Sequence, residues 1–394
     1  MSAPDVVIVS AKRTPIGAFL GALSPLTAVQ LGSAAAQGAV QAAGVAPEDI
    51  QEVIMGCVLP ANLGQAPARQ AALGAGIPQS VPATTINKMC GSGLKAVMMA
   101  AEQIRSGTAE VILAGGLESM SNAPYLLAKA RSGYRMGSGE VIDHMLRDGL
   151  QSPFDGKSMG CFADATAARY NFTRAQQDAF ATESVRRAQA AVASGAFAGE
   201  IVAVKVATRK GEVEVATDEQ PGKCDIAKIP TLKPAFRKEN GTVTAASSSS
   251  ISDGAAATVL MSADAAKKRG VKPLARVVAH ATHAQEPEWF TTAPVGAIRK
   301  VLDKAGWKVA DVDLFEVNEA FAVVAMAPMK ELGIAHEKLN IHGGATALGH
   351  PIGASGARLV VTLMHALKQG GGRRGVAALC IGGGEATAIA LELA

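Results

Sequence analysis

The stretch Asn87-Lys88-Met89-Cys90-Gly91-Ser92-Gly93 places a single cysteine between an apolar segment and a run of helical periodicity. Apolar residues then recur at the spacing of a helix with one buried stripe, at Leu94, Val97, Met98, Ala101 and Ile104. Cys90 is therefore expected at a helix N-terminus, where unpaired backbone N–H groups favour a thiolate over a thiol. We interpret it as a candidate nucleophile. A buried structural cysteine is the alternative for this stretch taken alone.

The chain contains one sequence unit twice. Each copy has a helix-ending glycine, an acidic residue five positions later, a glycine-rich helix start, and a strand ending in glycines and a glutamate. These features lie at Gly44, Asp49, 91–93 and 115–118 in the first copy, and at Gly306, Asp311, 353–356 and 382–385 in the second. Four matched features in one order predict a duplicated β-α-β unit and an α/β fold. We expect the matched loops of the two halves to surround one shared site.

Length and composition indicate a large globular protein. The chain has 394 residues, of which 48% are hydrophobic, and this length suggests roughly two to three domains. The net charge of +4 indicates no nucleic-acid or membrane partner, although small anionic ligands fit it. No apolar run approaches the length of a membrane span, and the strand-like segment 6–9 begins almost at the N-terminus, so we expect no targeting segment.

The five cysteines favour a reducing compartment. They are odd in number and contain no C-x-x-C pair, at positions 57, 90, 161, 224 and 380. This pattern argues against a disulfide framework and against a structural zinc site. We therefore expect a cytoplasmic protein.

The region between the two copies differs from both. Residues 121–170 resemble a long excursion with few regular elements, residues 173–194 predict a polar helix that starts after Thr173, and residues 200–240 are charged and irregular. Apolar segments closely flank Ser247–Ser250, so a ligand-lining loop is favoured over a flexible linker. The expected division is an N-terminal half (1–121), an inserted loop domain (122–249), a return to the first half (250–271) and a C-terminal half (272–394).

A nucleophilic cysteine needs a base and a group that stabilises an oxyanion. His350 lies in the rigid turn Gly349–Gly353 of the second copy, which the duplication sets opposite Cys90, whereas the other histidines are expected to be structural. Cys380 ends a buried strand just before a glycine turn whose N–H groups can bind an anion. From spacing alone, the two cysteines and the histidine fit a redox pair, a metal site, or a nucleophile with a separate acid/base.

The segment Asn318–Phe321 follows the expected strand 314–317. Alone, its Asn-Glu pair is more typical of a helix cap than of a catalytic group. Together with the other loops, it becomes a candidate site element.

These loops together resemble the thiolase family, acetyl-CoA acetyltransferases that join or cleave β-ketoacyl-CoA. The resemblance extends from about residue 5 to the C-terminus, and it rests on Asn87–Gly93, Asn318–Phe321, Gly349–Gly356 and Cys380–Gly384, supported by Ser10–Gly17 and Ala114–Ser121. It implies two mixed sheets in five α/β/α/β/α layers, a loop domain inserted in the first half, and dimers or tetramers.

The resemblance also implies the role of each catalytic residue. Cys90 accepts the acyl group, His350 takes its proton, and Cys380 removes the α-proton of the second acetyl-CoA. Asn318 positions a water that forms one oxyanion hole with His350, and the N–H groups of Cys90 and Gly382 form the other. The reaction is a condensation of two acetyl-CoA to acetoacetyl-CoA, or its reverse. No metal or redox cofactor is implied, and coenzyme A is a substrate.

The expected coenzyme A contacts include several departures from the family pattern. Ser158 stands where many members have histidine, Phe290-Thr291 where Met-Gly is usual, and Gly222-Lys223 where an arginine is expected. The full set of expected contacts is Ser158, Met159, Lys223, Ala245, Ser249, Phe290, Ala320 and Phe321. The alternatives are a ketoacyl-synthase-like condensing enzyme and a non-catalytic acyl-CoA or lipid carrier on the same scaffold.

Overall fold

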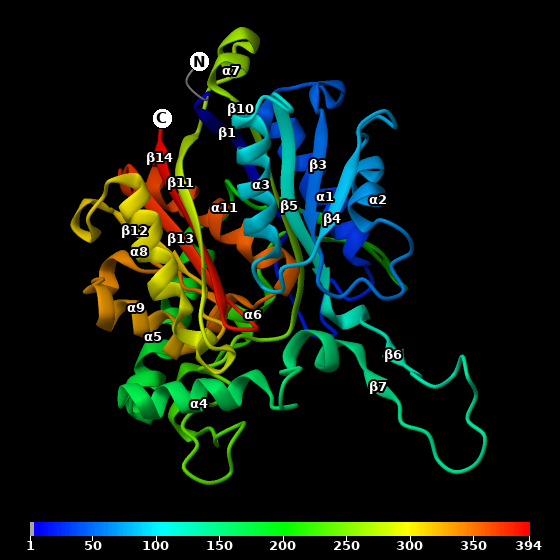
Figure 1. Ribbon diagram of the computed structural model, residues 1–394, viewed down its shortest axis with the longest axis vertical. Helices are drawn as coiled ribbons and strands as arrows, with labels where there is room; N and C mark the ends of the chain where they lie inside the picture. Colours follow the sequence, from blue (N-terminus) through cyan, green and yellow to red (C-terminus); the bar gives the residue numbers. More distant parts are fainter. Residues whose placement is uncertain (1–3) are drawn as a thin grey trace.

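The computed structural model describes residues 4–394 and has two similar halves (Figure 1). The first half contains β1 (Val6–Arg13), β2 (Gly17–Ala18), α1 (Ala28–Ala43), β3 (Glu52–Gly56), α2 (Pro67–Gly74), β4 (Ala83–Ile86), α3 (Ser92–Arg105), β5 (Val111–Ser119), β10 (Ser252–Ser262) and α7 (Ala263–Arg269). The second half contains β11 (Ala275–Ala284), α8 (Ala293–Ala305), β12 (Leu314–Val317), α9 (Ala322–Leu332), α10 (Ala345–Leu348), α11 (Ile352–Gly370), β13 (Arg374–Ile381) and β14 (Glu385–Leu393).

The strands form a mixed sheet in the order β12-β13-β14-β11-β1-β10-β5-β3-β4, with β2 beside β10. The pairs β3·β4, β3·β5 and β12·β13 are parallel, and the other pairs are antiparallel. The two expected sheets are the two parts of this ladder, which meet where Val7 pairs with Arg276 and Ile8 with Ala275. The mixed α/β fold predicted from the sequence is confirmed.

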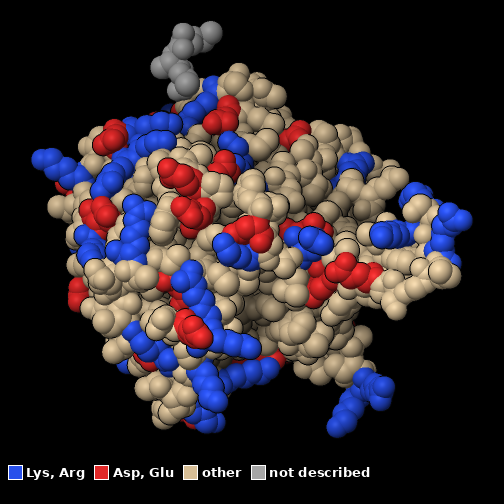
Figure 2. All heavy atoms as spheres, turned by 60° about the horizontal axis from the view of Figure 1, so that its bottom comes forward, with Lys and Arg blue, Asp and Glu red and all other residues tan. Residues whose placement is uncertain are grey.

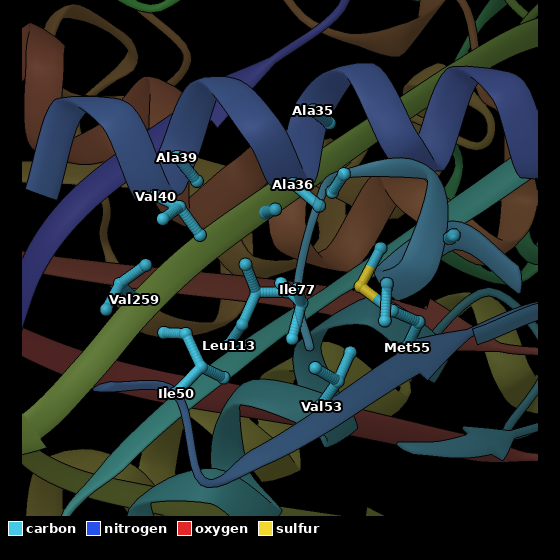
Figure 3. Close-up of a cluster of buried hydrophobic side chains, with 14 of the residues drawn as sticks. Ala35, Ala36, Ala39, Val40, Ile50, Val53, Met55, Ile77, Leu113 and Val259 are labelled. Carbon is cyan, nitrogen blue, oxygen red and sulfur yellow. The ribbon is translucent and has the colours of Figure 1, made fainter. Parts of the chain in front are cut away.

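Helices cover each part of the sheet on both faces (Figure 1). The first part packs against α1 and α2 on one face, the second part packs against α8 on its outer face, and α3 and α11 lie between them. Figure 3 shows the first outer layer, where small and branched side chains of α1 pack on β3, β5 and β10. Alanine on α1, at Ala35, Ala36 and Ala39, lets the helix approach the sheet closely.

The duplication predicted from glycine spacing is confirmed in the backbone. Gly44 ends α1 with φ 66°, and Gly306 ends α8 with φ 68°, the left-handed conformation that glycine adopts most easily. A 3₁₀ turn and a parallel strand follow each glycine. The helix predicted by the apolar stripe after Gly93 is present as α3, and the helix start expected at 353–356 is present as α11, which begins at Ile352.

The inserted region is more regular than the sequence suggested. It contains β6 (Tyr125–Leu126), β7 (Ile142–Asp143), α4 (Met159–Tyr170), α5 (Arg174–Ser194), the hairpin β8 (Val204–Thr208) and β9 (Gly211–Val215), and α6 (Glu219–Lys223). The prediction of α5 is confirmed, with Thr173 and Gln176 forming a capping box. The expectation of few regular elements was wrong for α4 and for the β8–β9 hairpin. Around β6 and β7 the chain extends away from the body as a long arm (Figure 1).

Among residues 4–394, no helix is both long and apolar enough to cross a membrane. All five cysteines are free thiols in the described structure.

Candidate active site

The Cys90 loop is held in a strained turn directly before α3. Met89 has a positive φ of 48°, which is rare for a residue with a long side chain. The hydroxyl of Ser92 stabilises the turn, because it accepts the N–H of Lys88 at 2.8 Å and donates to the carbonyl oxygen of Met89 at 2.7 Å. A side chain at Gly91 would overlap Ile381 of the second half. Glycine at this position therefore allows the two halves to meet at Cys90.

Cys90 is a thiol in the free protein, and the expected thiolate is wrong. Burial raises the pKa of its thiol to about 11, and the nearby carboxyl of Glu118 adds to the rise. Hydrogen bonds from the backbone N–H groups of Gly382 and of Cys90 itself act in the opposite direction and do not outweigh burial. Attack by this sulfur therefore requires a base that removes its proton during the reaction.

His350 lies in a rigid turn that fixes its tautomer. Its Nδ1 is 2.6 Å from the hydroxyl of Ser355, and that hydroxyl donates to the carbonyl oxygen of Pro351 at 2.9 Å. Since the hydroxyl proton is already donated, Nδ1 carries the hydrogen and Nε2 has the unprotonated lone pair. Burial, together with the charge of Arg358, lowers the pKa of His350 to about 3. The imidazole is therefore neutral and can accept a proton at Nε2.

Asn318 lies beside this lone pair. Its Nδ2 is 3.3 Å from Nε2 of His350, and its Oδ1 accepts from the buried guanidinium of Arg358 at 3.4 Å. Because a guanidinium can only donate, this contact orients the amide N–H groups toward His350. Asn318 does not cap a helix, since α9 begins later at Ala322, and the next residue, Glu319, accepts hydrogen bonds from Ser184, Asn340 and Thr346.

Cys380 is the next-to-last residue of β13 and is 1% exposed. Burial raises the pKa of its thiol well above the usual value, and the proximity of Cys90 contributes to this rise. The following Gly383 and Gly384 have positive φ values of 96° and 91° and turn the chain back into β14. A side chain at Gly382 would meet only the sulfur of Met159, at 3.7 Å. This turn therefore leaves open space beside Cys90.

A cavity of about 260 Å³ reaches His350 from the surface. Its lining is mostly apolar, with serines on one side: Met120, Leu146, Leu150, Ser158, Met159, Gly160, Phe236, Ser248, Ser249, Ser250, Ile251, Phe321, His350 and Ile352. Three of the four members of the serine run, Ser248, Ser249 and Ser250, line this cavity, and their role in binding a ligand stays a prediction. Ser247 instead binds the N–H of Thr244 at 2.8 Å.

The remaining predicted contacts lie at different places. The carbonyl oxygen of Ala320 accepts the N–H of Ser249 at 3.0 Å, which joins the two loops at the cavity wall. Phe290 is buried in the cluster that contains Cys380, Ala245 is exposed, and Lys223 forms an ion pair with Glu219 at 2.6 Å on α6. The structure thus brings Ser158, Met159, Ser249 and Phe321 to this cavity but not Lys223.

Sequence reasoning did not identify Ser355, Arg358 or Glu118 as functional. Ser355 and Arg358 lie on the first turns of α11, where a polar side chain in an apolar stripe was the available signal. Glu118 ends the matched motif of the first half. Within residues 4–394, no group of three or more His, Cys, Asp or Glu side chains is arranged to hold a metal ion.

The surface at the end of the molecule that carries α4 is hollowed near its middle (Figure 2). Lys and Arg side chains gather along one edge of the hollow (Figure 2). This distribution favours an anionic ligand at that edge.

Comparisons with known proteins agree with this geometry. The family model of the thiolase N-terminal domain matches residues 6–264, and that of the C-terminal domain matches residues 271–393. Acetyl-CoA acetyltransferase 2 of Arabidopsis thaliana is 52% identical over 99% of this chain and 97% of its own length. The mitochondrial acetyl-CoA acetyltransferase of Bos taurus is 51% identical over 98% of this chain and 91% of its own length. The crystal structure of the Bacillus anthracis acetyl-CoA acetyltransferase matches at a TM-score of 0.97 and 42% identity, with both chains fully covered. The chain belongs to the thiolase family.

Proposed function

We propose that the protein transfers acyl groups between coenzyme A thioesters through an acyl-Cys90 intermediate. It joins two molecules of acetyl-CoA into acetoacetyl-CoA and coenzyme A, or cleaves a 3-ketoacyl-CoA with coenzyme A in the reverse direction. The observation that carries this proposal is the meeting of the two cysteines and Gly382 in one place, since the N–H of Gly382 reaches the Cys90 sulfur and Cys90 lies close to Cys380. Asn318 lies beside Nε2 of His350, and Ile352 of the His350 turn packs in the same apolar cluster as Cys90. Relatives named acetyl-CoA acetyltransferase support it and do not favour a ketoacyl synthase or a non-catalytic carrier.

In the first half-reaction, Nε2 of His350 takes the proton of Cys90 as the sulfur attacks the thioester carbonyl. The developing oxyanion is stabilised by the N–H groups of Cys90 and Gly382, the two donors that already point at the Cys90 sulfur. When the carbon–sulfur bond to coenzyme A breaks, the leaving thiolate takes the proton held by His350 and departs as a thiol. The neutral imidazole suits the role of base because its Nε2 is unprotonated and can take a proton.

In the second half-reaction, Cys380 passes its thiol proton to His350, and the resulting thiolate removes the α-proton of a second acetyl-CoA. A thiol whose pKa is raised by burial gives a strongly basic thiolate, which matches a weakly acidic carbon. The carbanion attacks the acyl-Cys90 carbonyl, and the bond to the Cys90 sulfur breaks. Cys380 keeps the proton removed from carbon, and His350 returns its proton to the Cys90 sulfur, so the site is regenerated. A water positioned by Asn318, together with His350, stabilises the enolate oxygen of the second acetyl-CoA.

Coenzyme A is a substrate in this scheme, and no other cofactor takes part. The apolar cavity with its serine wall fits the pantetheine arm, with Ser158, Met159, Ser249 and Phe321 as its contacts. The basic edge in Figure 2 fits the phosphates. We assign Ala245, Ala320, Phe290 and Lys223 as further coenzyme A contacts, where Lys223 would have to leave its pair with Glu219.

We also propose a cytoplasmic homodimer or homotetramer that acts in fatty acid metabolism. The arm around β6 and β7 supports oligomerisation because its apolar side chains are exposed, with Tyr125 67%, Leu127 53% and Met136 99% accessible. Five free thiols support a reducing compartment. Sedimentation equilibrium should give two or four times the subunit mass of 40.1 kDa, and a monomer would contradict the assembly. Cell fractionation tests the compartment.

The direct test of activity mixes acetoacetyl-CoA with coenzyme A and follows the loss of enolate absorbance. We expect acetyl-CoA as the product. Undiminished turnover by Cys90→Ala would contradict the assignment of the nucleophile. Repeating the assay across a series of acyl lengths defines the chain-length preference of the cavity.

A further inference from the structure

Glu118 is a buried carboxyl that the proposed reaction does not use. It lies at the end of β5 with 0% exposure. One oxygen accepts the N–H of Val58 at 3.0 Å and the N–H of Gly353 at 2.9 Å. The other accepts the N–H of Leu59 at 3.1 Å and the thiol of Cys57 at 3.8 Å. All four partners donate, so the carboxylate satisfies three backbone groups that would otherwise be buried without acceptors.

These donors come from both halves of the molecule. Val58 and Leu59 follow β3 in the first half, whereas Gly353 lies in the first turn of α11 in the second half. Gly353 is three residues beyond His350, and Ile352 between them packs in the same apolar cluster as Cys90. Glu118 therefore fixes the turn that carries the proposed base.

Hydrogen bonds also connect the Glu118 carboxylate to the Cys90 loop, by way of the loop that follows β3. The side-chain amide of Asn87 donates to the carbonyl oxygen of Val58 at 3.4 Å. A Cβ at Gly56 would lie 2.5 Å from the Cβ of Ser92, so the end of β3 touches the start of α3 directly. Glu118 thus links the Cys90 loop to the His350 turn through two short paths.

The backbone around the Glu118 carboxylate is tightly packed. A Cβ at Gly353 would lie 2.7 Å from the Glu118 oxygen, and a Cβ at Gly116 would overlap the carbonyl oxygen of Gly353. Likewise, a Cβ at Gly93 would lie 2.8 Å from the nitrogen of Ala357. The starts of α3 and α11 are therefore in backbone contact around the carboxylate, and a shift of either helix start must disturb its hydrogen bonds.

The matched glutamate of the second half reaches across in the opposite direction. Glu385 follows the glycine turn 382–384 and forms an ion pair with Lys88, two residues before Cys90. Its side chain is 33% exposed, and that of Lys88 is 25% exposed. Each half thus contributes one strand-end glutamate that contacts the other half, although only Glu118 is fully buried.

We infer that Glu118 is a positioning residue, which sets the relative placement of Cys90 and His350 by binding backbone groups of both halves. The inference rests on the proposed function, because the placement matters through proton transfer from Cys90. Loss of the carboxylate leaves buried N–H groups without acceptors and lets the His350 turn move. A displacement of about 1 Å in such a site costs about 100-fold in rate.

The test compares Glu118→Gln with the wild type in the cleavage of acetoacetyl-CoA, with rates expressed per mole of folded protein. The amide keeps the shape but offers one acceptor oxygen instead of two. We expect kcat to fall about 100-fold with KM changed less than about threefold, because most of the cavity wall lies outside the His350 turn. The rate of Cys90 acylation by acetyl-CoA, measured by quenched-flow mass spectrometry, should fall by the same factor as kcat.

The matched control is Asp313→Asn. Asp313 also accepts two backbone N–H groups, from Arg373 at 2.7 Å and Arg374 at 2.8 Å, but within one half of the molecule. Its kcat should stay within about twofold of the wild type. Gly353→Ala attacks the same link without changing a charge, and it should reproduce the fall in kcat at unchanged KM even if Glu118→Gln does not fold.

A folded Glu118→Gln or Gly353→Ala protein with wild-type acylation would overturn the inference and leave the proposed function intact. An inactive wild-type protein would instead contradict the proposed function itself. A parallel rise in KM and fall in kcat would assign Glu118 to the shape of the cavity and also overturn its positioning role.

Discussion

The two glycine-rich strand ends show how one duplicated motif serves two purposes. At the end of β5, the position of Gly116 is closed, because a side chain there would overlap the backbone of α11. At the end of β13, Gly382 faces open space, with only the sulfur of Met159 within 4 Å. The first glycine pair allows two helix starts to touch, whereas the second leaves room for a ligand beside Cys90.

This difference teaches that the halves share a scaffold but divide the chemistry. The first half contributes the proposed nucleophile, and the second contributes the proposed base and the second cysteine. The closed end brings the backbones of the two halves into contact, and the open end leaves room for the proposed substrate. Substitutions in matched positions should therefore affect stability in one half and catalysis in the other.

The largest expected effect separates the two cysteines. Cys90→Ala should lose both half-reactions, by at least about 10⁴-fold, because it removes the acyl acceptor. Cys380→Ala should lose condensation by about 10³-fold, the scale of one general acid/base, while the first acylation continues. Stopped-flow release of coenzyme A from acetyl-CoA measures the first step, and acetoacetyl-CoA formation measures the second. Equal loss of both steps in both variants would contradict separate roles for Cys90 and Cys380.

The next effect compares one glycine from each strand end. Gly116→Ala should lower the free energy of unfolding by about 1–3 kcal/mol, because the added methyl forces the start of α11 to move. Gly382→Ala should leave unfolding within about 0.5 kcal/mol but lower kcat/KM about 10- to 200-fold, since its methyl occupies ligand space. Urea titration and steady-state kinetics give the two numbers. The comparison fails if Gly382→Ala destabilises the fold more than Gly116→Ala.

A smaller effect is expected at the exposed bridge between Lys88 and Glu385. Glu385→Gln and Lys88→Met should each lower kcat about two- to fivefold, and the double variant should lose little more than either single one. The effect should weaken further at high salt, because the pair is partly exposed. Fully additive losses in the double-mutant cycle would show that the two side chains act independently.

The smallest expected effect is in the ultraviolet absorbance of the Cys90 thiolate, which should not appear near neutral pH. Burial raises the pKa of Cys90 to about 11 and lowers that of His350 to about 3. Both groups should therefore remain neutral between about pH 5 and about pH 9. A raised thiol pKa means that the thiolate appears only as pH approaches about 11. The ultraviolet thiolate absorbance of the wild type minus that of Cys90→Ala should therefore stay near zero up to about pH 9. A thiolate titrating near neutrality would contradict this picture.

The sequence predicted what depends on local pattern. Gly44 and Gly306 marked the duplication because a left-handed helix end needs glycine, and the apolar stripe after Gly93 located α3. Helix α4 was missed because small residues without a clear stripe follow a glycine-rich segment. The charge state of Cys90 was mispredicted for a different reason: the helix start is a local feature, whereas burial and the Glu118 carboxyl come from contacts far apart in the chain.

The same distinction explains the site. The glycine motifs pointed to Cys90, His350 and Cys380 as candidate site residues. The side chains that hydrogen-bond to the surrounding loops could not be identified from the sequence, because they lie far away along the chain. The bond from Arg358 to Asn318 spans 40 residues, and the bond from Gly353 to Glu118 spans 235. Only folding reveals such pairs.

The most direct test of the division between the halves is to trap the intermediate. Cys380→Ser protein is incubated with acetyl-CoA, quenched in acid and mapped by peptide mass spectrometry. We predict one acetyl group per subunit, carried by Cys90, with almost no acetoacetyl-CoA formed. Acetylation of another cysteine, or no covalent adduct at all while the wild type turns over, would contradict the account.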